Sequence, residues 1–182
     1  MKKQLNKQYI EIPSSLKRLN YFSGQLLTQA DFQTEQSYLI ERNRLHNIHL
    51  FGYGVVSGLA VSVSKNSPNS VIVNPGFAID ARGNEIFLPA AVHVPIPEKG
   101  HEAYLILNWA EREIDFVPMS EGNVPSRVEE YAILKFKVED PTTKPKTRKI
   151  FESHDGIILA RLKKIRSAWK VDKKFRVRQV RT

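Results

Sequence analysis

The chain has 182 residues, 41% hydrophobic and 26% charged, and its 28 Lys and Arg against 19 Asp and Glu give a formal net charge of +9. These proportions are ordinary for a globular domain, and no apolar run approaches the roughly 20 residues of a membrane-spanning helix. The lack of cysteine excludes disulfides and thiolate metal sites and fits a reducing cytoplasm. The basic N-terminus has no apolar stretch, so we do not expect a secretory signal.

The positive charge is concentrated near the C-terminus. Residues 141–182 hold 14 Lys and Arg against 3 Asp and Glu, a net charge of +11, whereas residues 1–140 hold 14 against 16, a net charge of −2. Such asymmetry indicates either an acidic partner, such as nucleic acid, lipid headgroups or an acidic protein surface, or basic side chains that line solvent faces and protect edge strands.

A long helix is predicted near the N-terminus. Residues 1–17 are expected to form a polar arm or, at 9–12, a short strand, and a tight turn follows around Gly24. Thr28 precedes Asp31 by three residues, which is a helix N-cap spacing. The helix should run from about Gln29 to about His49, because this stretch contains neither Gly nor Pro.

The predicted helix has little apolar surface. Phe32, Leu39 and His46 recur every seven residues, with Gln36 and Asn43 beside them. A stripe of this mixed kind lies on the surface or packs against another copy through polar positions. The expected solvated face carries Glu35, Glu41, Arg42 and Arg44, and the interface candidates are Tyr21, Phe22, Phe32, Gln36, Leu39, Asn43, His46 and Leu50.

The rest of the chain is predicted to form short strands. Alternation over 53–63 indicates a half-buried strand, and turn residues then separate further apolar runs. The expected strands are 71–73, 77–80, 85–88, 92–94, 103–110, 114–117, 132–138, 157–162, 168–171 and 175–180, with breaks at 111–113, 118–127 and 139–149. The fold class is therefore mainly β (α+β), with one long helix before an antiparallel sandwich or barrel-like domain. Residues 1–54 would form the N-terminal segment, the turn and the long helix, and residues 55–182 would form the β domain.

No set of residues predicts catalysis. His46 and His49 could share a metal from one helix face, but no third ligand is evident. Asp80 and Glu85 flank a turn, where such residues occur for backbone reasons. Trp169 and Phe175 lie among basic residues, as in a nucleic-acid platform, but also where a closing strand needs core side chains. We therefore expect no enzyme, no cofactor and no metal.

Three blocks of the sequence stand out together. The first is Asn20-Tyr21-Phe22 with Gly24-Gln25-Leu26-Leu27-Thr28, then Asp31-Phe32, Glu35-Gln36 and Tyr38. The second is Arg44-Leu45-His46-Asn47, then Leu50, Gly52, Gly54-Val55-Val56 and Gly58-Leu59. The third is Val73-Asn74-Pro75-Gly76-Phe77-Ala78-Ile79-Asp80, followed by Gly83, Glu85-Ile86 and Leu88-Pro89. These blocks resemble small proteins encoded with phage-tail-like contractile injection systems, and the third also resembles modules of phage baseplate and tail-fibre proteins. Leu159-Ala160-Arg161-Leu162 and Trp169-Lys170-Val171-Asp172 resemble the closing strands of such modules.

The resemblance implies a non-enzymatic structural subunit at the baseplate, spike or tail end of such a particle. Its partners would be other particle subunits and further copies of itself, as a trimer or hexamer, docked through the helix and the β domain. It would be cytoplasmic during assembly and then part of a particle that is extracellular or membrane-attached. The alternative from the residues is a β module that binds a polyanion or carbohydrate through the basic C-terminal face.

Overall fold

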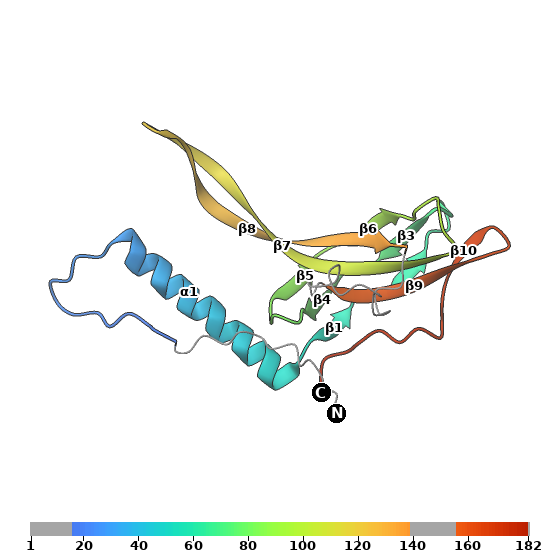
Figure 1. Ribbon diagram of the computed structural model, residues 1–182, viewed down its shortest axis with the longest axis horizontal. Coiled ribbons are helices and arrows are strands. Elements are labelled where there is room, and N and C mark those ends of the chain that lie inside the picture. Colours follow the sequence, from blue (N-terminus) through green and yellow to red (C-terminus); the bar gives the residue numbers. More distant parts are fainter. Residues whose placement is uncertain (1–15, 139–155, 182) are drawn as a thin grey trace, which may run out of the picture.

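The computed structural model describes residues 16–138 and 156–181 (Figure 1). In these residues helix α1 (Gln29–His46) continues into a π-helical turn (Asn47–Phe51), and ten strands follow. The predicted mainly-β class with one N-terminal helix is confirmed. The polar segment or short strand expected within residues 1–15 and the break expected at 139–149 lie outside the described residues. The strands are β1 (Gly54–Gly58), β2 (Val61–Val63), β3 (Ser70–Val73), β4 (Gly76–Ile79), β5 (Glu85–Leu88), β6 (Val92–Pro95), β7 (Glu102–Met119), β8 (Gly122–Lys137), β9 (Ile157–Ile165) and β10 (Ala168–Val171).

The first layer is an antiparallel meander that bends in the middle. Its halves are the sheets β1-β4-β5 and β2-β3-β6, and the backbone N–H groups of Leu59 and Asn74 bridge the two halves. The single strand predicted over 53–63 is thus divided into β1 and β2. Gly58, with a φ of +65°, lies at the bend, where a Cβ would collide with the carbonyl oxygen of Pro75. A glycine is needed there for both reasons.

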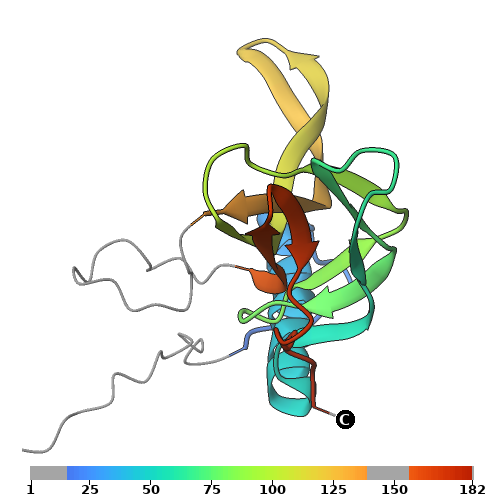
Figure 2. The same cartoon turned by 90° about the vertical axis from the view of Figure 1, so that its right-hand side faces the viewer.

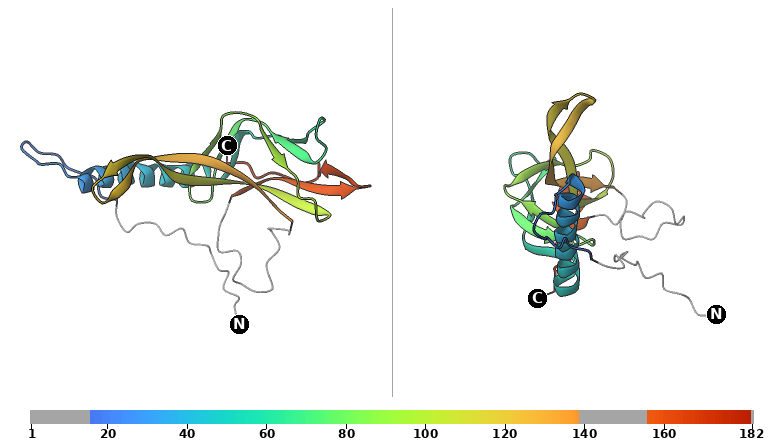
Figure 3. Two further views of the ribbon diagram at one scale, coloured as in Figure 1. Left: turned by 90° about the horizontal axis from the view of Figure 1, so that it is seen from above. Right: turned by 90° about the vertical axis from the view of Figure 1, so that its left-hand side faces the viewer.

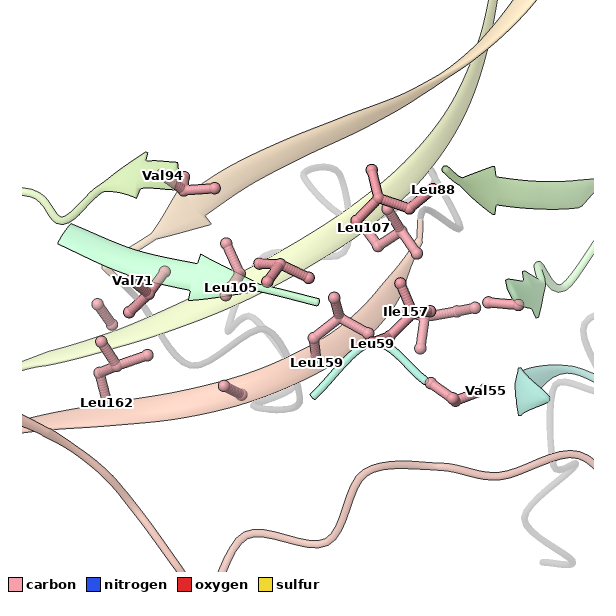
Figure 4. Packing of buried hydrophobic residues seen from close by; sticks show 14 of the residues in the cluster. Val55, Leu59, Val71, Leu88, Val94, Leu105, Leu107, Ile157, Leu159 and Leu162 are labelled. Atoms are coloured by element: carbon pink, nitrogen blue, oxygen red, sulfur yellow. The ribbon is translucent and has the colours of Figure 1, made fainter. Parts of the chain in front are cut away.

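The second layer is an antiparallel sheet in the order β10-β9-β7-β8. Its inner face packs against the meander, so that the core lies between the two layers (Figure 4). Val71, Leu105 and Leu162 are fully buried there. Because β7 has buried residues on both faces near its start, it is the central strand that its sequence predicts.

The predicted breaks at 111–113 and 118–127 are wrong. Strands β7 and β8 form one long hairpin, paired from Tyr104 and Lys137 out to Met119 and Gly122. Its outer part stands clear of the two layers (Figure 1), so both faces tolerate the charges that suggested a loop. Pro125 is tolerated because β8 is an edge strand.

The predicted strand at 175–180 is also wrong. Only Gln179 forms a bridge, parallel to Val55, and the flanking hydrogen bonds join Val55 N to Arg178 O (2.8 Å) and Val180 N to Val55 O (3.1 Å). In its pairing with β4, strand β1 has a shift of register between Val55 and Ser57.

The helix and the outer hairpin extend from the same side of the strand layers. Seen from above (Figure 3, left), both lie along the same direction, and in the end view (Figure 3, right) both point toward the viewer. The opposite end carries β9 and β10, which face the viewer in Figure 2. The molecule is therefore elongated, with two projections at one end. No helix among residues 16–138 and 156–181 is long and apolar enough to cross a membrane.

Candidate assembly interface

The helix is attached to the strands at its C-terminal end. Arg44 Nε donates to Asn84 Oδ1 (2.6 Å), and the Asn47 side-chain amide donates to the Gly83 carbonyl oxygen (2.9 Å) and to Glu85 Oε1 (3.1 Å). The Arg44 guanidinium also lies 5.4 Å from the ring centre of Trp109. Sequence reasoning placed Arg44 on the solvated face, which is wrong, because this residue belongs to the attachment.

The turn that receives the helix is built by Asp80. Its Oδ1 accepts hydrogen bonds from the backbone N–H groups of Arg82 (2.8 Å) and Asn84 (2.9 Å), and its Oδ2 accepts from the Asn84 amide (2.8 Å). Asp80 therefore serves the backbone, as its turn context predicts. Glu85 contacts Asn47 instead of Asp80, so the two carboxyl groups do not form an acid–base pair.

Gly83 lets the turn touch the helix backbone. Its φ is +87°, and a Cβ there would collide with the carbonyl oxygen and Cα of Arg44. The turn and the backbone of the helix are therefore in direct contact. Asn47 and Gly83 are 36 residues apart, and no local pattern predicts their pairing.

The free end of the helix is capped locally. Asp31 N donates to Thr28 Oγ1 (3.3 Å) and Thr28 N donates to Asp31 Oδ2 (2.8 Å), which completes the predicted capping box. The Thr28 N–H and the Thr28 hydroxyl both donate to Asp31 Oδ2, and these two bonds lower the pKa of Asp31. The Tyr21 hydroxyl donates to Glu35 Oε2 (2.7 Å), and this bond raises the pKa of Tyr21. The turn before the helix is thus fastened to its first two turns.

No side chain of α1 is buried. Phe22 is 68% exposed, Phe32 52% and Leu39 53%. Leu50, in the π-helical turn, is 63% exposed. The structure places all eight interface candidates at the surface, and they are Tyr21, Phe22, Phe32, Gln36, Leu39, Asn43, His46 and Leu50.

The histidine pair on the helix gains no further ligand. His46 and His49 are both exposed, and no cluster of three or more His, Asp or Glu side chains suited to a metal occurs within 16–138 and 156–181.

The aromatic side chains of the basic C-terminal third serve packing. Trp169 is 6% exposed and belongs to the core, with Lys164 Nζ 5.7 Å from its ring centre. Phe175 lies edge-on to Tyr104, with the ring centres 6.4 Å apart. Neither ring is an open stacking platform of the kind that single-stranded nucleic acid uses.

An ion-pair cluster joins β9 to the end of β10. Asp172 Oδ2 lies 2.5 Å from Arg161 Nη2 and 3.1 Å from Lys163 Nζ, and Asp172 Oδ1 accepts from Lys174 N (2.9 Å). The Lys174 N–H and the Lys163 and Arg161 side chains lower the pKa of Asp172 to about 2. Beside this cluster is a cavity of about 300 Å³, lined by apolar residues of β1, β2 and β9 and by residues 171–179.

The comparisons with known proteins give a likeness of fold. No protein-family model matches the sequence, and no curated protein sequence matches it. A chain of the type VI secretion system TssK-TssF-TssG baseplate subcomplex, determined by cryo-electron microscopy, matches with a TM-score of 0.52 and 12% identity over 90% of this chain and 62% of that chain. A chain of the baseplate complex from the type VI secretion system matches with a TM-score of 0.55 and 11% identity over 90% and 60%.

A crystal structure of TssK also matches, with a TM-score of 0.49 and 14% identity over 87% of this chain and 41% of that one. This chain therefore spans about three fifths of the length of the first two matched chains. At these identities the similarity is one of fold. The fold is a strand sandwich with a projecting helix, and over 90% of this chain it is similar to chains of two type VI secretion baseplate assemblies.

Proposed function

We propose that this chain is a non-enzymatic structural subunit of a phage-tail-like contractile injection particle, located at the baseplate or tail end. The fold similarity to two chains of type VI secretion baseplate assemblies supports this assignment. The observation that carries it is the helix, which is fixed at one end and buries no side chain. An enzyme has no evident use for such an element, whereas an assembly subunit does.

The physical argument concerns what stabilises a helix. Most helical stability in proteins comes from packing an apolar face, and α1 packs none against its own strands. The capping box and the Tyr21–Glu35 bond hold it formed. Phe32 and Leu39 are then displayed to solvent in a preformed arrangement, which lowers the entropic cost of binding. A neighbouring subunit that covers this face supplies the missing burial.

The two parts of the chain take different roles in this proposal. Residues 1–54 dock to neighbours through the stripe that contains Gln36, Leu39, Asn43 and His46, and residues 55–182 form the β domain that holds the helix in position and adds contacts of its own. The chain works as a symmetric homo-oligomer, a trimer or a hexamer, assembled in the cytoplasm before it becomes part of the particle.

The test places charge on the stripe. The double variant Leu39→Asp with His46→Asp is expressed together with the other subunits of the particle, and intact particles are counted by electron microscopy. We expect at least about tenfold fewer particles, because two carboxylates would be buried without partners in the docked state. Circular dichroism and thermal unfolding of the purified variant should show an intact strand domain.

The matched control is Gln33→Asp with Ser37→Asp. Both residues are exposed, and at about 100° per residue Ser37 lies on the side of the helix away from Leu39. This variant adds the same charge to the same helix and should assemble normally. Normal assembly of the Leu39/His46 variant would make the helix a surface brace and refute the proposed docking role.

A further inference from the structure

The outer part of the β7–β8 hairpin, residues 111–130, is an acidic projection that we call the arm. It carries six Asp and Glu against two Arg, a net charge of −4. Both arginines are used inside the arm, since Arg112 Nε lies 2.5 Å from Glu129 Oε2 and Arg127 Nη1 lies 2.5 Å from Asp115 Oδ2. Four exposed carboxylates have no ion pair among the described residues, and they are Glu111, Glu113, Glu121 and Glu130.

The arm also displays apolar side chains near its tip. Phe116 is 56% exposed, Val117 47%, Met119 63% and Val124 51%. The arm consists of two strands that pair only with each other, because β9 pairs with β7 only over Glu102–Leu107. A lone two-stranded ribbon is marginal in water, and exposed apolar strand surface favours association. The arm therefore has the composition of a surface that another chain covers.

The C-terminal end of the described chain carries the complementary charge. Residues 156–181, which we call the basic end, hold ten Lys and Arg against Asp172 alone, a net charge of +9. Arg161 and Lys163 are paired with Asp172, and Arg178 stacks 3.6 Å from the ring centre of Tyr53. Six exposed cations have no ion pair among the described residues, and they are Arg166, Lys170, Lys173, Lys174, Arg176 and Arg181.

The basic end also lines a depression of mixed polar and apolar character. The cavity of about 300 Å³ is lined by Leu59, Leu159, Phe175 and Val177, with Lys173 among its lining residues. This volume is at the lower limit of small-molecule sites, which run from about 300 to 1,000 Å³. It suits inserted side chains of another protein at least as well as a free ligand.

We propose that the arm of one copy binds the basic end of the next copy, with its tip side chains against this cavity. The arm projects away from the strand layers, whereas residues 156–181 run from the β9–β10 end of the molecule back to the root of the helix, where Arg181 N donates to Phe51 O (Figure 1). The arm therefore points away from its own basic end. A contact between two different surfaces of identical chains is heterologous and joins copies head to tail. Nucleic acid would use only the basic end, and a basic partner only the arm, whereas a second copy satisfies both.

This contact needs only copies of this chain and does not involve the helix stripe. Self-association through the arm and docking through the helix are therefore tested separately, and either proposal can fail without the other. Analytical ultracentrifugation of the full chain should show self-association that weakens as salt is raised from about 0.05 M to 0.5 M, because exposed charges are screened. Replacing Glu111, Glu113, Glu121 and Glu130 by Lys, or Lys170, Lys173, Lys174 and Arg176 by Glu, should each raise the dissociation constant at least about tenfold, because like charges then oppose each other.

Mixing the two charge-reversed variants is the decisive experiment. Each then presents a surface complementary to the other, so association should return, and this recovery also shows that both variants are folded. A control variant, Lys17→Glu with Arg18→Glu and Arg82→Glu, changes exposed cations outside both surfaces and should associate like the original chain.

Three results would overturn the proposal: a chain that stays monomeric up to its solubility limit, self-association that neither reversal changes, or a mixture that does not recover. Duplex DNA bound at about 0.15 M salt, lost with the reversed basic end but kept with the reversed arm, would assign the basic end to nucleic acid instead.

Discussion

The side-chain amide of Asn47 donates a hydrogen bond to the carbonyl oxygen of Gly83, 2.9 Å away, and so fastens the end of the helix to the turn between β4 and β5. Asn47 is 8% exposed, in contrast to every residue of α1 itself. The direction in which the helix projects is therefore set by a few contacts at its root. Any surface that the helix presents to a partner depends on them.

Replacing Asn47 by Ala should weaken the attachment of the helix to the turn between β4 and β5. The Gly83 carbonyl would lose a buried partner, a loss that typically costs about 1–3 kcal/mol. Hydrogen exchange of the backbone amides over 44–48 and 83–85 should speed up accordingly. The control is Asn43→Ala, one turn earlier in α1 and exposed, which should stay within about 0.5 kcal/mol of the original chain. Equal exchange in the two variants would mean that Asn47 does not hold the helix.

Gly83→Ala tests the close approach at the same point. The new Cβ would meet the Arg44 backbone, in addition to the strain of an L residue at a φ of +87°. Gly24 is a matched control, because its φ is +85° and nothing lies within 4 Å of a Cβ there. Both variants carry the strain of about 1 kcal/mol or more, so the difference in their unfolding free energies measures the collision. We expect Gly83→Ala to be clearly the less stable, and equal values would contradict the close contact.

Thr28→Ala should fray the start of the helix. The hydroxyl accepts from Asp31 N, and losing such a cap costs about 1 kcal/mol. Because the helix buries nothing, the loss should appear as lower helicity and faster exchange over 29–34 while the strands keep their stability. Thr28→Ser keeps the oxygen and should behave like the original chain. A uniform loss of stability across the strands would show that the cap supports the whole fold.

The acid stability of the chain should depend on Asp172. Its pKa is about 2 in the folded chain against an ordinary value of 3.8, because Lys174 N–H, Lys163 and Arg161 stabilise the charged form. A lowered folded-state pKa contributes stability above the ordinary value, and this contribution is lost as the pH falls from about 4 to about 2. Urea unfolding across pH 2–6 should therefore show a smaller fall for Asp172→Asn, which is also less stable at neutral pH. The exposed Glu98→Gln serves as control, and an unchanged pH profile for Asp172→Asn would contradict the ion-pair cluster.

Much of the fold follows from local sequence. The Thr28–Asp31 spacing predicts the start of the helix, and turn residues such as Asp80 and Gly83 separate the short strands of the meander. The arm could not be predicted in this way, because its strands have no buried face and hence no alternation of apolar and polar residues. Its cross-strand ion pair between Arg112 and Glu129 joins residues 17 apart, and charged stretches of that kind also occur in loops.

The same distinction between local sequence and tertiary contacts applies to the candidate interface. Exposure of the helix stripe follows from its mixed composition, whereas the attachment of Arg44 to Asn84 joins residues 40 apart and depends on the tertiary fold. The C-terminal segment 175–180 is predicted as a strand, but in it only Gln179 forms a bridge, to Val55 of β1. Local sequence patterns thus predict which residues are exposed, whereas contacts between residues far apart in the sequence determine how the helix and the C-terminal segment are attached to the strands.

The most direct test of the docking role is site-specific cross-linking in assembled particles. A photoreactive amino acid is placed at Leu39, on the stripe, or at Ser37, on the other side of the helix, and cross-linked products are identified by mass spectrometry. Docking through the stripe predicts strong cross-links from position 39 to another particle subunit or to a second copy of this chain, and few from position 37. Equal yields at the two positions, or none at 39 in intact particles, would contradict it.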